Sequence, residues 1–85
     1  MTHQFSIESV NAPTVLPRIA LIFTRRGIGI EHLEMATEAD RARFGLSASC
    51  TSDEAAKLGA QLRRIVEVVD VNVAAHEALA SAASA

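Results

Sequence analysis

The chain of 85 residues has one cysteine, three phenylalanines and neither tryptophan nor tyrosine. A single Cys50 excludes an internal disulfide and offers no paired thiols to a metal, as is usual in a reducing compartment. We interpret it as a buried structural residue. A sheet that reads RNA needs exposed aromatic side chains on which bases stack, whereas we expect all three phenylalanines to face inward.

The chain also lacks a dominant charge of one sign, since its formal net charge is −2. This argues against nucleic-acid binding through phosphate contacts. No apolar run approaches the ~20 residues that cross a bilayer, and the first ten residues lack the basic start and apolar block of a signal peptide. We therefore expect a cytoplasmic protein without membrane association, with room for one small domain.

No residues form a recognisable nucleophile with its base. The histidines are far apart, and we expect only His32 to be ordered, as a partly exposed strand residue. Glu31 and Glu34 fall on opposite faces of a regular strand, so they make no acid–base pair. An acylphosphatase-like enzyme would need a glycine-rich phosphate loop with an arginine, which is not found. We expect no catalytic and no metal-binding residues, and hence a non-enzyme.

What is present is a series of alternating and amphipathic segments. Residues 4–10 alternate as a half-buried strand. Residues 14–26 carry an apolar stripe at helical spacing, with Thr14 as N-cap and Gly27 as a stop at positive φ. A second strand follows from residue 28, and its change of parity between Ile30 and Leu33 predicts either a β-bulge or a late strand start there. Residues 37–40 should be the turn.

The second half repeats this order. Residues 42–50 alternate as the clearest strand, Thr51, Ser52 or Asp53 caps a helix, and residues 69–73 form a last strand. The order β-α-β-β-α-β predicts an α+β ferredoxin-like sandwich, a four-stranded antiparallel sheet with two helices on one face. Its expected inward strand residues are Phe5, Ile7, Leu33, Met35, Phe44, Leu46, Val69 and Val71. We expect the domain to span residues 1–74, followed by an Ala/Ser-rich tail over 75–85 that is disordered or a frayed helix.

Two segments carry a resemblance to a known family. They are residues 16–33 (LPRIALIFTRRGIGIEHL), with the rather specific motif Arg-Gly-x-x-Ile-Glu-x-Leu at 26–33, and residues 61–68 (QLRRIVEV). Over about residues 3–74 the chain resembles the ACT domain of the small regulatory subunit of acetohydroxyacid (acetolactate) synthase, in its short single-domain form.

The resemblance implies a non-catalytic subunit that binds and activates a separate catalytic subunit in branched-chain amino-acid biosynthesis. That partner would use thiamine diphosphate, Mg²⁺ and FAD, and this chain would bind no cofactor itself. The family also pairs its ACT domains side by side, so we expect a homodimer with Glu31, Leu33 and Met35 on the second strand as its candidate edge. The alternative is a freestanding ACT module that senses another amino acid or small ligand.

The resemblance also places a candidate effector site in two segments. Its residues would be Asn11, Ala12, Pro13, Thr14, Val15, Leu16, Gly29 and Ile30. Members that bind valine have an asparagine ending the first strand, a glycine before the first helix and an asparagine after it. Here Asn11 matches, whereas Thr14 and Gly29 replace the other two. Pro13 lacks a backbone donor, and a β-branched residue at a positive φ would be strained. We therefore expect no valine control.

Overall fold

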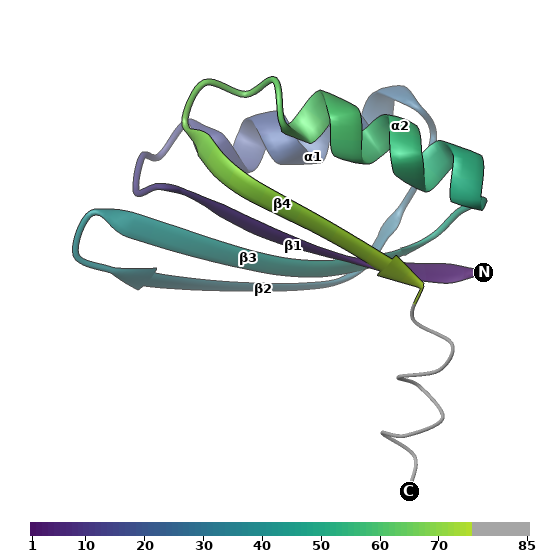
Figure 1. Ribbon diagram of the computed structural model, residues 1–85, viewed down its shortest axis with the longest axis horizontal. Coiled ribbons are helices and arrows are strands. Elements are labelled where there is room, and N and C mark those ends of the chain that lie inside the picture. The colour runs from purple at the N-terminus through teal and green to yellow at the C-terminus, as the bar shows by residue number, and fades with distance from the viewer. Residues whose placement is uncertain (76–85) are drawn as a thin grey trace, which may run out of the picture.

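The computed structural model describes residues 1–75, and the predicted tail lies, from residue 76 onward, outside these described residues. Its elements are β1 (Thr2–Val10), α1 (Val15–Arg25), β2 (Ile30–Glu38), β3 (Arg41–Ser49), α2 (Ser52–Leu62) and β4 (Val68–Ala75). The strands form one antiparallel sheet in the order β2-β3-β1-β4. Figure 1 shows both helices on one face of this sheet, and no helix or strand of residues 1–75 covers the other, open face. The predicted ferredoxin-like sandwich is confirmed.

Helix α1 is held by its apolar stripe and ended by a glycine. Val15, Ile19 and Phe23 are buried against the sheet, and the ring of Phe23 packs edge-on against Phe5 of β1, with ring centroids 5.2 Å apart. Gly27 has φ 69°, and the backbone N–H of Ile28 donates to Phe23 O at 3.0 Å. These are the features of a Schellman motif, so the predicted stop at Gly27 is confirmed.

Helix α2 begins with a capping box. The Glu54 backbone N–H donates to Thr51 Oγ1 at 3.1 Å, and the Thr51 N–H donates to Glu54 Oε1 at 2.9 Å. Leu58 and Leu62 complete the core between helix and sheet. A Cβ at Gly59 would lie 3.1 Å from Cγ2 of a β4 valine, so this glycine permits close packing of α2 on the sheet. No helix among the described residues is long and apolar enough to span a bilayer.

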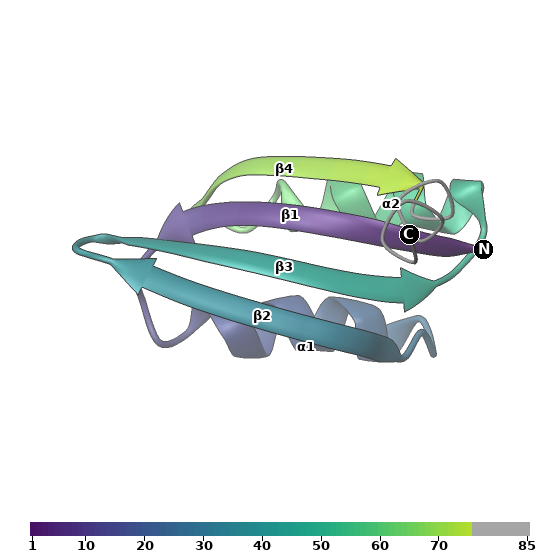
Figure 2. The ribbon, with the colours of Figure 1, turned by 90° about the horizontal axis from the view of Figure 1, so that it is seen from below.

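The predicted bulge in β2 is confirmed, since the register to β3 shifts between Ile30 and His32. It sets Leu33 and Met35 opposite Leu46 and Phe44, on the helix-covered side. Both nevertheless stay 40% and 46% exposed, so their expected place in the core is wrong. The reason is that β2 is an edge strand, with a neighbouring strand on one side only (Figure 2).

A second bulge, between β1 and β4, corrects another expectation. The register shifts so that Ser9 lies opposite Val68, and Val69 has no partner residue. Val68 is partly buried and Val69 is 55% exposed, so Val69 is not the core residue that the alternation predicts.

The turn between β2 and β3 is shorter than the predicted turn over residues 37–40. Strand β2 continues to Glu38, and the chain reverses at Ala39, with φ 55°, and Asp40.

Candidate effector and interface site

The loop between β1 and α1 is fixed by its neighbours on both sides. The Val10 N–H donates to Glu67 O at 2.9 Å, and the Asn11 N–H donates to Asp40 O at 2.8 Å. The side chain of Asn11 donates through Nδ2 to Ala39 O at 3.3 Å. The candidate segment 11–16 is therefore preformed, because it is tied to the connection before β4 and to the β2–β3 turn.

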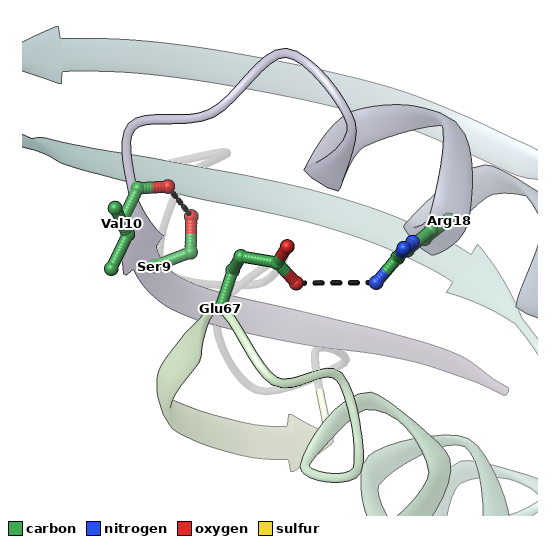
Figure 3. Close-up of polar contacts among 4 residues, drawn as sticks. All are labelled: Ser9, Val10, Arg18 and Glu67. Carbon is green, nitrogen blue, oxygen red and sulfur yellow. Dashed lines mark hydrogen bonds and ion pairs between the residues drawn. The ribbon is translucent and has the colours of Figure 1, made fainter.

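An ion pair joins the first turns of α1 to the same connection. Arg18 Nη1 lies 3.2 Å from Glu67 Oε1, as Figure 3 shows. The pair is partly exposed, so we assign it no more than about 1 kcal/mol. Ser9, beneath it at the end of β1, is fully buried, and its hydroxyl donates to Val10 O at 2.9 Å. The buried Ser9 hydroxyl therefore has a hydrogen-bond acceptor within the chain.

Helix α1 starts differently from α2. Thr14 occupies the predicted N-cap position but makes no side-chain cap hydrogen bond, and the first turn holds no acidic residue. Positive partial charge at this end favours an anion such as an amino-acid carboxylate. Thr14 has φ −82°, so the expected strain of a β-branched residue at positive φ does not arise here.

The other candidate effector residues lie at the far end of the sheet. Ile30 is opposite Ala48 of β3, which is opposite His3 at the start of β1. Asn11 follows the last residue of that nine-residue strand, roughly 25 Å away at the usual rise of a strand. Within one chain, Gly29 and Ile30 are therefore not brought together with segment 11–16.

The candidate dimer edge is open in the described structure. Strand β2 lies at the sheet edge as predicted and pairs, among the described residues, with β3 alone. Leu33 and Met35 are exposed along it, and Glu31 accepts a hydrogen bond from Ser49 Oγ at 3.0 Å. The opposite edge differs, because Arg63 Nη2 donates to Val71 O of β4 at 2.9 Å. The Arg63 side chain thus engages one carbonyl of β4, which hinders strand addition at that point of the edge.

One buried polar contact was not anticipated. His3 is 4% exposed within β1, and its Nδ1 lies 3.7 Å from Cys50 Sγ. The expectation that only His32 is ordered is therefore wrong. The alternation of His3 with Phe5 along the strand was the sequence signal that could have predicted the burial of His3. Burial raises the pKa of the Cys50 thiol, and the Glu54 carboxylate raises it further. No group of three or more metal-binding side chains occurs in the described part of the chain.

Comparisons with known proteins identify the fold described above. No family model matches the sequence. The fold matches the ACT domain of the GTP pyrophosphokinase of Chlorobium tepidum, with a TM-score of 0.76 and 13% identity over 87% of this chain and 97% of that chain. It also matches the acetolactate synthase small subunit of Thermotoga maritima, with a TM-score of 0.75 and 24% identity over 86% of this chain and 47% of that chain. The described residues thus have the fold of an ACT domain.

Sequence similarity identifies the family to which this ACT domain belongs. The chain is 35% identical over 72 residues to the acetolactate synthase small subunit of Mycobacterium bovis, a match that covers 82% of this chain and 43% of that relative. The chain therefore belongs to the acetolactate synthase small-subunit family. The chain spans less than half the length of the curated relative it matches.

Proposed function

We propose that this protein is a regulatory subunit that binds the catalytic subunit of acetolactate synthase in the cytoplasm and raises its activity. The observation that carries the proposal is the 35% identity over 72 residues to a protein named as that small subunit. In this proposal the chain performs no chemistry itself. Thiamine diphosphate, Mg²⁺ and FAD belong to the catalytic partner.

A homodimer through β2 is part of the proposal. A two-fold axis between two β2 strands sets them antiparallel, because a self-complementary contact is isologous. The Ile30 end of one strand then lies next to the Glu38 end of its partner. Since Asn11 bonds to Asp40, just after Glu38, segment 11–16 of one protomer comes close to Gly29 and Ile30 of the other. The dimer would thus complete an effector site that one chain leaves divided.

Co-purification from native extract tests the proposal. The tagged chain should retain a thiamine-diphosphate-dependent synthase, identified by mass spectrometry, when it is incubated with extract of its source organism. A Leu62→Asp variant, which places a carboxylate in the core, is the unfolded control and should retain none. If the folded chain retains no synthase but is stabilised by an amino acid, the freestanding sensor is the correct interpretation.

A further inference from the structure

The open face of the sheet carries a depression that the effector site does not use. It has a volume of about 320 Å³, and its lining includes Ser6, Glu8, Glu34, Arg43, Gly45 and Asp70. A second depression of about 230 Å³ adjoins it, because both are lined by Glu34 and Gly45, and it extends to Ser47. Gly45 of β3 therefore lies where the two depressions meet.

The protein's own structure does not account for a glycine at position 45. Gly45 is opposite Ser6 of β1 and Glu34 of β2, inside regular pairing on both sides. Its backbone is outside the positive-φ region, and a Cβ built there would meet no atom within 4 Å. By contrast, Gly59 is needed for close packing on β4. A glycine inside a strand weakens it and often marks close approach by a ligand or another backbone.

The charges around this glycine are mostly negative: Glu8, Glu34 and Asp70 line the depression with one arginine, Arg43, which lies opposite Glu8 across the β1–β3 pair. Glu8 lies directly opposite Asp70 across the β1–β4 pair, and like charges in such positions repel. Arg41 Nη1 lies 3.6 Å from Glu8 Oε2, whereas Asp70 has no ion pair among the described residues. Glu34, on the other side of Gly45, lies 2.9 Å through Oε1 from Nε2 of the exposed His32 and forms no other ion pair among the described residues. A cationic side chain from outside would therefore relieve the repulsion.

A second copy of the chain does not suit this face. Two copies face to face would bring the same carboxylates together, which costs free energy through like-charge contact. The helix layer and its connections carry more basic than acidic side chains, with Arg18, Arg25, Arg26, Lys57, Arg63 and Arg64 against Asp53, Glu54 and Glu67. Placing it on the open face of another copy would, however, give a head-to-tail contact with no closed symmetry, which risks open filaments. The face suits a different protein.

We propose that the open sheet face around Gly45 is the surface that docks the catalytic subunit of acetolactate synthase. The partner lays a backbone segment against Gly45 and inserts a Lys or Arg side chain beside Glu8 and Asp70. This assignment rests on the proposed function and adds the surface and its chemistry to it. It leaves the β2 edge free for the homodimer.

Titration calorimetry with the purified catalytic subunit of the same organism tests the assignment. Gly45→Val fills the depression with a residue that strands favour, so the melting temperature of the free variant should be unchanged or higher. Its affinity for the catalytic subunit should fall at least tenfold. Asp70→Lys should weaken binding similarly, and more at low ionic strength than at high. The control, Ala60→Leu on the exposed side of α2, should bind as the unmodified chain does.

The outcomes separate the two proposals. If the unmodified chain binds and Gly45→Val binds equally well, the surface assignment is wrong and the proposed function stands. If Ala60→Leu is the variant that loses affinity, the helix layer is the docking face instead. A change in the sedimentation mass of free Gly45→Val would show that a second copy occupies the open face. If the unmodified chain itself does not bind, the proposed function fails, and the surface assignment fails with it.

Discussion

At the scale of single residues, His3 and Cys50 join the start of β1 to the end of β3 through a buried contact. A thiol in this position is protonated and shielded at neutral pH, because burial is the main cause of its raised pKa. Reactivity requires the thiolate. Cys50 therefore contributes packing rather than chemistry.

The raised pKa of Cys50 predicts a loss of stability at alkaline pH. Below pH 9.0, the ordinary value, both the folded and the unfolded thiol hold their proton. Above it the unfolded thiol ionises first, so the free energy of unfolding falls by up to about 1.4 kcal/mol per pH unit until the pH passes the folded pKa. Urea denaturation at pH 7.5 and pH 10 should show a larger loss for the unmodified chain than for Cys50→Ala. Equal losses would contradict this account of the thiol.

Thr14 and Gly29 carry the prediction about valine. We expect millimolar valine to leave the melting curve of the unmodified chain nearly unmoved. A ligand at a hundred times its dissociation constant would add about 2.7 kcal/mol, or more than ~10 °C in a domain this small. The double change Thr14→Gly with Gly29→Asn should create a response to valine. The first substitution opens space at the start of α1, and the second supplies the side-chain amide that valine-binding members have after the helix.

The structure makes the second substitution sterically feasible. A Cβ at Gly29 meets no atom within 4 Å, and Gly29 is not among the residues with positive φ. The single variants are the controls, and each should respond less than the double variant. A saturable shift of the unmodified chain with valine would show that the site tolerates Thr14 and Gly29, and the interpretation of this loop would be wrong.

At the scale of elements, the two helices offer a matched comparison of N-caps. Thr51 closes a capping box, whereas Thr14 makes no side-chain cap. Thr51→Ala should therefore destabilise the fold by about 0.5–2 kcal/mol, and Thr14→Ala by less than ~0.5 kcal/mol. Denaturant midpoints of the two variants measure the difference. Similar losses would mean that the cap of α1 forms in solution.

Local signals in the sequence predicted most of the elements. Gly27, Thr51 and the bulge after Ile30 were predictable because each is encoded by neighbouring residues. The exposure of Val69 was not predictable, because its alternation with Val71 is regular and the bulge depends on pairing with β1.

The candidate site illustrates the same limit. The sequence identifies segments 11–16 and 29–30 as separate pieces but does not place them. A right-handed crossover returns the chain to the end of the sheet where β1 began. The segment after α1 therefore lies one strand length from the segment before it, and the proposed dimer would bring them together.

At the scale of the whole molecule, the two sheet edges predict how chains associate. Leu33→Lys places a charge on the open β2 edge, where it opposes strand pairing, and should convert the proposed dimer to a monomer. Val69→Lys on β4 is the matched control, since Val69 is 55% exposed and that edge is engaged by Arg63. Sedimentation equilibrium at micromolar protein measures both. A monomeric mass for the unmodified chain, or dissociation by Val69→Lys alone, would refute pairing through β2.

In the proposed function, this ACT domain regulates a separate catalytic subunit. The most direct measurement is the rate of acetolactate formation by the purified catalytic subunit of the same organism, titrated with this chain. We predict that the rate rises and saturates at a fixed ratio of the two chains, and that Gly45→Val requires at least tenfold more protein for the same rise. A rate that stays constant up to a large excess of the folded chain, with no complex detected, would contradict the account.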